Sequence, residues 1–150
     1  MGYAQWLPDT AKVLVIVDRD DDDCLQLKDR LEQMAHKAGL GTRQRHVQGQ
    51  FQVINRIAIE ELEAWFFGDW EAVRAAYPKV DDSVPQRAGY RNPDAIKGGT
   101  WEALERELQK KGYFKQGLRK LELARSVASH MDPARTRSQS FCCLREALAQ

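Results

Sequence analysis

The sequence predicts an α/β protein, with a parallel-sheet core over residues 12–77 and a mainly helical half over residues 78–150. One observation is KVLVIV at residues 12–17, a β-branched and apolar run typical of a strand that is buried on both faces in a parallel sheet. The other is the order of the segments, in which strand and helix alternate before helices alone follow. A length of 150 residues suits one domain with its own hydrophobic core.

A helix is predicted after the first strand and an acidic turn. In residues 21–40 the apolar side chains recur at helical spacing, and Gly39 provides a stop. The side chains with this spacing are Leu27, Leu31, Met34, Ala35 and Ala38. Residues 43–50 are polar and predict a loop or an edge. A second strand is predicted over residues 51–59, where apolar residues gather on one face.

The next segment predicts a helix over residues 60–77 that is broken near Gly68, with Asp69 as the cap of its second part. Its aromatic side chains are expected in the core: Trp65, Phe66, Phe67 and Trp70. Residues 78–99 contain three prolines and three glycines, so we expect a long irregular segment of a kind that is usually functional or mobile.

Three further helices are expected in the last third of the chain. Thr100 is the expected cap of a helix over residues 101–112, and another helix begins near Gly117. The last helix has Ser138 or Ser140 as its cap.

Composition and charge exclude several classes of protein. Hydrophobic residues make up 43% and charged residues 30% of the chain, which indicates a globular protein. No apolar run reaches the roughly 20 residues of a membrane span, and the first residues lack the features of a signal peptide, so we expect a cytoplasmic protein that makes no membrane contact. The three cysteines and three histidines lack the spacing of a disulfide framework or a zinc site.

Charge is distributed unevenly along the chain. Residues 1–75 carry a net charge of −4, from 9 Lys/Arg against 13 Asp/Glu, and residues 76–150 carry +5, from 14 against 9. Two sides of a phosphate-binding cleft would explain this difference, as would two halves that attract each other. A nearly neutral total argues against a protein that coats nucleic acid by charge alone.

Five carboxylates crowd residues 18–23, directly after the first strand. In open parallel sheets functional residues gather just beyond the carboxyl ends of the strands. The Asp-x-Asp pair of Asp18 and Asp20 suits a hard divalent cation, Mg²⁺ or Mn²⁺, whose charge would offset the repulsion within the cluster. Residues 21–23 stand at the start of a helix, where capping explains acids as well, and Asp22 is also a candidate outer ligand of the metal.

A third carboxylate is expected after the second strand, where Glu60, Glu61 and Glu63 follow. The first two fit the first turn of a helix. Glu63 lies deeper among aromatic residues, where a carboxylate without a partner is costly. It is therefore the candidate for an extra metal ligand or a general base.

The basic half offers candidate phosphate ligands. Lys115 and Arg119 are four residues apart, so we expect them to face the same way and to steady a scissile phosphate. Arg135 and Arg137 are interleaved with hydroxyl residues and form a second candidate grip on phosphate. A solvated helix surface and a helix cap are the alternative explanations.

Five blocks of sequence stand in order along nearly the whole chain: VLVIVDRDDDDC, VINRIAIEELEAWFFGDWEAVRAAYP, PDAIKGGTWEALE, GYFKQGLRK and RSQSF. Together they resemble the domain-of-unknown-function family 4276, a group of bacterial and archaeal proteins regarded as Toprim-like. The resemblance implies a Toprim-like (Rossmann-like) sheet core. The wider Toprim group binds Mg²⁺ for phosphoryl transfer on nucleic acid through a glutamate and an Asp-x-Asp pair.

By position, the resemblance implies Asp18 and Asp20 as the metal-binding pair and matches Glu63 to the family's Glu-Ala-Trp block. Lys115 and Ser140 match its late lysine and its Ser-Phe block, so with Arg119 they are expected to bind the substrate. Members usually begin with another strand that bears an acidic Val-Glu motif, whereas the eleven residues before Lys12 contain no Glu. An N-terminally truncated chain and a degenerate member are both open explanations.

Three functions follow from these observations. The first is a Mg²⁺-dependent nuclease or phosphoryl-transfer domain acting on DNA or RNA. The second is a catalytically degenerate binding subunit of a phage-defence complex, beside an ATPase encoded alongside. The third is a phosphatase of the haloacid-dehalogenase kind, which also begins with strand-Asp-x-Asp but normally has Thr or Val at the position of Asp22.

Overall fold

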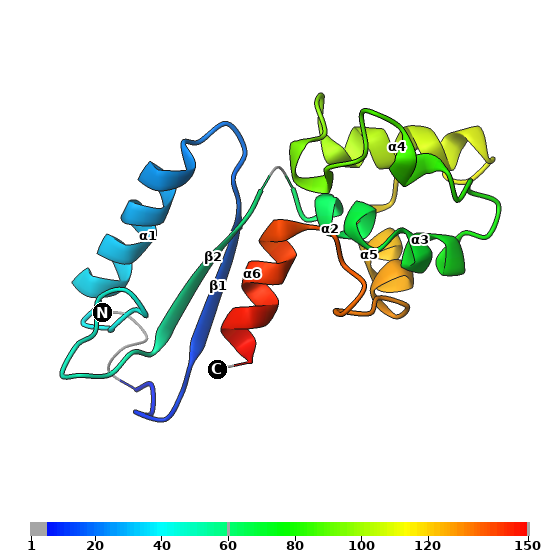
Figure 1. The fold of residues 1–150 in the computed structure, drawn as a ribbon. Coiled ribbons are helices and arrows are strands. Elements are labelled where there is room, and N and C mark those ends of the chain that lie inside the picture. The colour runs from blue at the N-terminus through cyan, green and yellow to red at the C-terminus, as the bar shows by residue number, and fades with distance from the viewer. Residues whose placement is uncertain (1–5, 60, 150) are drawn as a thin grey trace. The chain divides into compact units, whose positions relative to one another are not determined.

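The computed structural model describes residues 6–59 and 61–149, and the chain forms two compact units. Unit 1 comprises Met1–Ile57 and unit 2 comprises Ala58–Gln150 (Figure 1). The described residues form a two-strand parallel sheet and six α-helices, which confirms the mixed α/β class. None of the helices in the described ranges is long and apolar enough to cross a membrane.

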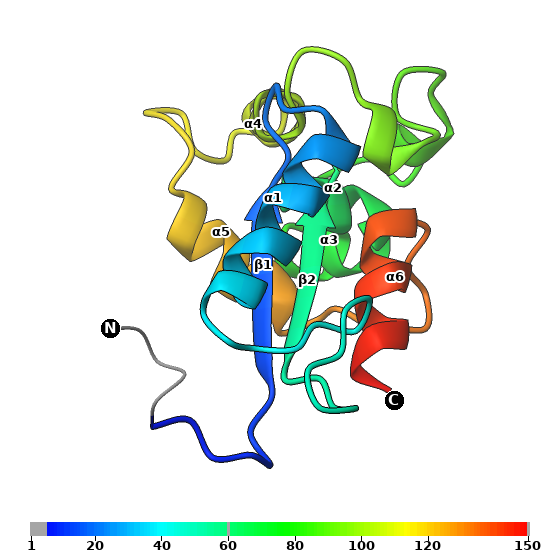
Figure 2. The ribbon, with the colours of Figure 1, turned by 90° about the vertical axis from the view of Figure 1, so that its left-hand side faces the viewer.

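Unit 1 is a strand–helix–strand arrangement of β1 (Val13–Asp18), α1 (Cys24–Lys37) and β2 (Val53–Ala58), whose last residue begins unit 2. The two strands are hydrogen-bonded neighbours. Parallel neighbours need a long crossover connection, and α1 supplies it, lying along one face of the strands (Figure 1, Figure 2). Both strands and the helix agree in order and approximate position with the prediction.

Burial of β1 differs from the prediction. Alternate residues of this strand are exposed, and Leu14 and Ile16 have exposed fractions of 37% and 39%. Successive side chains of a strand point to opposite faces, so one face of β1 is only partly covered. The prediction that this strand is buried on both faces is therefore wrong.

Helix α1 begins with a side-chain cap. The Asp23 carboxylate accepts hydrogen bonds from the amides of Leu25 and Gln26, at 3.0 and 2.9 Å. The helix ends before Gly39, whose φ of 77° lies in the left-handed region that glycine tolerates. Of the expected apolar face, Leu27 and Ala35 are buried, whereas Met34 is 65% exposed.

A buried carboxylate joins α1 to β2 within unit 1. Glu32 accepts hydrogen bonds from Thr42 Oγ1 and from Asn55 Nδ2 (2.9 Å), and its Oε1 lies 3.3 Å from Lys28 Nζ. Burial raises the pKa of Glu32, but the hydrogen bonds from Thr42 and Asn55 and the charge of Lys28 outweigh burial and lower it below its ordinary value. The charged form is therefore the one that the fold stabilises.

Unit 2 contains the larger hydrophobic core. Its elements are α2 (Glu63–Gly68), α3 (Trp70–Ala76), the 3-10 helices η2 (Val84–Gln86) and η3 (Pro93–Ala95), α4 (Thr100–Lys110), α5 (Lys120–Ala128) and α6 (Gln139–Leu148). Helix α2 packs against α3, α4 and η3, and α3 packs against α5. Phe67 is fully buried, stacks on Trp70 with ring centroids 5.3 Å apart, and meets Tyr90 in a tilted arrangement with ring centroids 5.2 Å apart. The predicted helix break at Gly68 and the irregular segment at 78–99 are both present.

The start of α4 is capped in a way that the sequence did not indicate. Gly99, not Thr100, is the cap residue, with a φ of 85°. The Glu61 carboxylate accepts hydrogen bonds from Thr100 N, Thr100 Oγ1 and Trp101 N, at 2.9, 2.8 and 2.9 Å. A carboxylate at this place satisfies the free amides of the first turn and suits the helix dipole.

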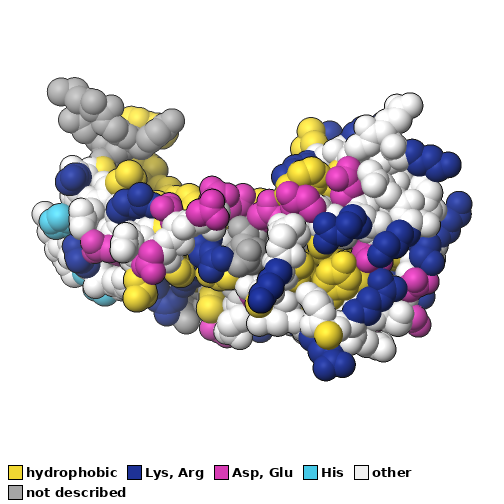
Figure 3. Space-filling model, turned by 90° about the horizontal axis from the view of Figure 1, so that it is seen from above, with side chains coloured by type: hydrophobic (Ala, Val, Ile, Leu, Met, Phe, Trp, Pro, Cys, Tyr) yellow, Lys and Arg dark blue, Asp and Glu magenta, His cyan; other side chains and the backbone are white. Residues whose placement is uncertain are grey.

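Lys and Arg side chains gather over unit 2 in the view from above (Figure 3). Part of this charge is neutralised within the unit, because Arg87 and Lys110 bind the buried Glu107 at 2.8 and 2.7 Å and Lys111 binds Asp81 at 2.8 Å. Burial raises the pKa of Glu107, but Lys110 and Arg87 outweigh burial and lower it. Cations available to a ligand must therefore be sought elsewhere on unit 2.

Candidate functional site

The acidic turn follows β1 directly. Asp18 is the last residue of β1, and Asp20 has a φ of 49°. Aspartate adopts this left-handed backbone more readily than most residues other than glycine. Asp18, Asp20 and the three aspartates that follow are all exposed. The turn therefore presents its carboxylates to solvent at the carboxyl end of the strand.

The acids of the turn differ in how they are engaged. Asp23 caps α1, and the Asp22 carboxylate forms an ion pair with Arg30 on the same helix. In residues 6–59 and 61–149, neither Asp20 nor Asp21 has a side-chain hydrogen bond or ion pair. Capping therefore explains one of the three acids predicted to cap, and the candidate outer ligand Asp22 is engaged by Arg30.

Glu63, the candidate third carboxylate, is the first residue of α2 and is buried, with an exposed fraction of 9%. It belongs to unit 2, whereas Asp18 and Asp20 belong to unit 1. Glu60 lies outside the described residues, and Glu61 is engaged at the start of α4. Within the described part of the chain, no three His, Cys, Asp or Glu residues lie close enough together to hold a metal ion.

Ser140, a candidate substrate ligand, lies in a buried polar cluster of unit 2. Its hydroxyl donates to Asp94 Oδ1 at 2.8 Å and accepts a hydrogen bond from Trp65 Nε1 at 2.8 Å. Its amide donates to Asp94 Oδ2 at 3.1 Å, and the Ser138 hydroxyl also reaches Oδ1 at 2.8 Å. Ser138 caps α6, as predicted. This cluster fixes the start of α6 to η3 and α2.

Asp94 is the residue of this cluster that sequence reasoning missed. The available signal was the Asn-Pro-Asp sequence at residues 92–94, in which Asn92 accepts a hydrogen bond from the Asp94 amide at 3.1 Å. This signal predicts a turn, but it does not identify the distant serines that the carboxylate binds.

Lys115 and Arg119 line one cavity of about 460 Å³, in the loop between α4 and α5. The Arg119 guanidinium lies 5.6 Å from the centroid of the Phe114 ring and pairs with Glu122 at 2.9 Å. Lys115 is exposed, and its ammonium has no partner in residues 6–59 and 61–149. The structure thus brings together the two cations that helical spacing predicted to be neighbours.

Asp69 and Arg135 form a buried ion pair in place of the predicted cap. Asp69 stands between α2 and α3, but its carboxylate makes no cap hydrogen bond to α3. It accepts hydrogen bonds from Arg135 Nε and Nη2, at 3.1 and 3.0 Å, and from the Asp132 amide at 2.8 Å. Hydrogen bonding to Asp69 raises the pKa of Arg135 above its ordinary value. Arg135 is therefore held in place by the residue that directly precedes α3.

Comparison with known proteins identifies the family to which the chain belongs. A family model with the description Domain of unknown function (DUF4276) matches residues 4–149. No curated protein and no solved structure matches the chain. The match includes the acidic turn, Glu63 and the Ser140 cluster, and its description states no activity.

Proposed function

We propose that this chain, which belongs to the family Domain of unknown function (DUF4276), is a Toprim-like, metal-dependent phosphodiester hydrolase that acts on nucleic acid. The observation that carries the proposal is the acidic turn at the carboxyl end of β1. There Asp20, two residues from Asp18, offers an exposed carboxylate that no side chain among the described residues engages. Ligand sites of open parallel sheets lie at such strand ends.

Mg²⁺ or Mn²⁺ fits the chemistry of these donors. Such ions are commonly held by one or two carboxylates together with water and substrate phosphates, so the two exposed aspartates suffice without a preformed cluster of three. Asp18 and Asp20 would hold the ion. When bound, the ion polarises a phosphoryl group and lowers the pKa of a coordinated water.

The remaining steps belong to side chains of this protein. Lys115 and Arg119 would bind the scissile phosphate, and the Phe114 ring limits the positions that Arg119 can take. Glu63, which matches the family's Glu-Ala-Trp block, is the proposed general base that would accept a proton from the attacking water. Hydrolysis would break one phosphorus–oxygen bond and leave a hydroxyl and a phosphate end.

The cellular setting is proposed from the family resemblance. We place the protein in the cytoplasm, in phage defence, beside an ATPase encoded alongside. This setting follows from the resemblance to Toprim-like proteins, which are often encoded beside an ATPase, and the chemistry of the acidic turn is compatible with either DNA or RNA.

The test is cleavage of labelled single-stranded DNA, double-stranded DNA and RNA, with Mg²⁺, Mn²⁺ or EDTA. We expect metal-dependent cleavage that falls at least about 100-fold in Asp18→Asn and Asp20→Asn, since even residues that only orient metal ligands are worth about 10–100-fold. Asn tolerates the left-handed backbone at residue 20, so this variant removes charge without strain. Asp21→Asn is the matched control, because Asp21 is equally exposed and should retain activity.

The other outcomes separate the alternatives. Cleavage that survives in both Asp18→Asn and Asp20→Asn would refute the proposed metal site. Nucleic-acid binding with no cleavage under any metal would indicate a binding subunit. Hydrolysis of a generic phosphate ester that is lost in Asp18→Asn would indicate a phosphatase.

A further inference from the structure

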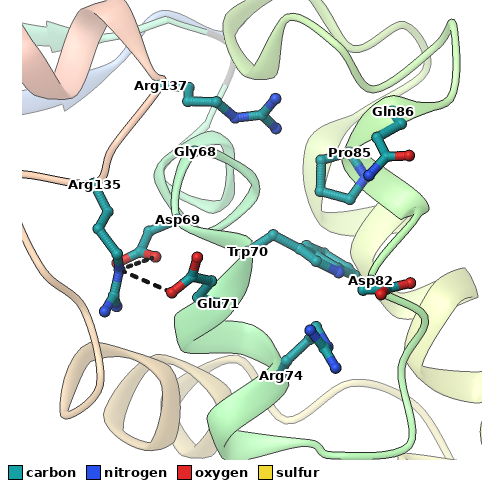
Figure 4. Close-up of a pocket in the computed structure, with 10 residues that line it drawn as sticks. All are labelled: Gly68, Asp69, Trp70, Glu71, Arg74, Asp82, Pro85, Gln86, Arg135 and Arg137. Carbon is teal, nitrogen blue, oxygen red and sulfur yellow. Dashed lines mark hydrogen bonds and ion pairs between the residues drawn. The ribbon is translucent and has the colours of Figure 1, made fainter.

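A second cavity in unit 2 is lined by arginines. It has a volume of about 300 Å³ and lies between the first turn of α3, η2 and the segment at residues 135–137 (Figure 4). Trp70, Pro85 and Gln86 form part of its wall, and Arg74, Arg135 and Arg137 reach it from two different segments. None of these arginines belongs to the acidic turn or to the Lys115 cavity.

Arg135 is the fixed member of this group. Its Nε and Nη2 atoms bind the Asp69 carboxylate, and Nη2 also donates to the His130 carbonyl at 2.9 Å. The side chain of Asp69 is 1% exposed, so its carboxylate cannot contact a ligand in the cavity. Its negative charge is balanced by Arg135 and does not repel an anion in the cavity.

Arg74 and Arg137 are the available members. Neither guanidinium has a hydrogen bond or ion pair in the described part of the chain. Figure 4 shows the Arg137 guanidinium extending past Gly68 toward Gln86, while Arg74 rises from α3 beside Trp70 and Asp82. Each guanidinium carries five N–H donors in a planar fork that matches the oxygens of a phosphate.

Two further carboxylates line the cavity and reduce its positive charge, those of Glu71 and Asp82. Glu71 has a side chain that is 75% exposed and stands 3.7 Å from Arg135 Nε. Asp82 is also exposed, and neither of these acids pairs with Arg74 or Arg137. Because both acids are exposed, water of high dielectric constant weakens their repulsion of an anion, whereas a ligand inside the cavity would contact the guanidinium groups directly.

The position of Arg137 depends on a close approach to Gly68. The Arg137 amide donates to the Gly68 carbonyl at 3.0 Å. A Cβ on residue 68 would lie 2.8 Å from Thr136 Oγ1 and 3.0 Å from the Ser138 amide nitrogen, so the segment could not approach any other residue as closely. The backbone under Arg137 is therefore fixed, and only its side chain is free to meet a ligand.

From these contacts we infer that the arginine cavity binds a phosphate group; that this phosphate belongs to a nucleic-acid strand rests on the proposed function. Arg137 is the main ligand, Arg74 binds an oxygen at the other end of the cavity, and Arg135 is a positioning residue held by Asp69. The inference uses residues of unit 2 alone and needs no metal. Its failure can be distinguished from a failure of the proposed hydrolysis, because binding is measured in EDTA, where no metal-dependent cleavage takes place.

The test measures binding of the intact chain to three probes in EDTA: inorganic phosphate, a 5′-phosphorylated oligonucleotide and the same oligonucleotide with a 5′-hydroxyl. We expect Arg137→Gln to weaken binding about tenfold or more, as the loss of hydrogen bonds to a charged group does. The slope of log affinity against log salt concentration, measured between about 50 and 200 mM, should also fall by the equivalent of roughly one phosphate contact. Arg74→Gln should weaken binding in the same direction.

The matched control is Arg106→Gln, which removes the same charge. Arg106 is an exposed residue of α4 and does not line the arginine cavity. Its affinity and salt dependence should stay at the level of the unchanged protein. Preference for the 5′-phosphorylated strand would identify a terminal phosphate as the ligand, and equal binding of both strands would identify a backbone phosphate. Equal losses in Arg137→Gln and Arg106→Gln, or no binding of any probe, would overturn the inference.

Discussion

The pair of Asp69 and Arg135 offers a quantitative test of how unit 2 is held together. The two partners differ in burial, since the Asp69 side chain is 1% exposed and the Arg135 side chain 36% exposed. Removing one partner of a buried pair costs about 3–5 kcal/mol when the other is left without compensation. The cost should therefore depend on which partner is removed.

Asp69→Ala leaves a cation that can turn toward water, and it also removes the acceptor of the Asp132 amide. We expect a loss of about 2–3 kcal/mol in the free energy of unfolding, below the full range for a buried pair. Arg135→Ala leaves a carboxylate that cannot reach water, with the Asp132 amide as its remaining partner. For this variant we expect about 3–5 kcal/mol.

Urea unfolding followed by tryptophan fluorescence is the suitable assay. Three of the four tryptophans, Trp65, Trp70 and Trp101, belong to unit 2, and Trp70 is adjacent to Asp69. Glu71→Ala is the control, because Glu71 is 75% exposed and approaches Arg135 only to 3.7 Å; surface pairs contribute at most about 1 kcal/mol. Equal losses in Asp69→Ala and Glu71→Ala, or a larger loss in Asp69→Ala than in Arg135→Ala, would refute this reasoning.

Two further predictions concern carboxylates with structural partners. Glu61→Ala should destabilise unit 2 by about 1–2 kcal/mol in urea unfolding, because the first turn of α4 loses its cap. Glu61→Gln should be less destabilised, because it keeps a hydrogen-bond acceptor. Equal losses in the two variants would contradict the capping role. The pKa of Glu32 is lowered in the folded state, so its contribution to stability is present above its ordinary pKa of 4.5 and is lost as the pH falls through the lower folded value. Unfolding followed by far-ultraviolet circular dichroism should show Glu32→Gln less stable than the unchanged protein at neutral pH, with a difference that shrinks in acid. A constant difference down to about pH 3 would contradict the shift.

Sequence reasoning succeeded where the signal is local. The break at Gly68 and the Ser138 cap of α6 are set by a few neighbouring residues, and both are present in the structure. The acidic turn likewise begins at the last residue of β1, because an apolar run ends where the aspartates start.

The sequence did not disclose partners that lie far along the chain. Glu61 fits the first turn of a helix by its position, yet its carboxylate caps a helix 39 residues later. Asp69 stands at a helix start, where capping is the ordinary expectation, but it binds an arginine 66 residues away. The predicted burial of both faces of β1 was also wrong, because an apolar run shows that a strand is hydrophobic but not how many of its faces are covered.

The contacts of Asp94 carry a consequence for synthesis of the protein. Its carboxylate binds residues 44 and 46 positions later in the chain, at the start of α6. The Glu32 contacts of unit 1 span at most 23 positions. On a ribosome, which releases the N-terminal end first, the strand–helix–strand segment can complete its buried polar contacts early. The helical part must instead wait until residues 138–140 have been synthesised, because Asp94 finds its partners only there.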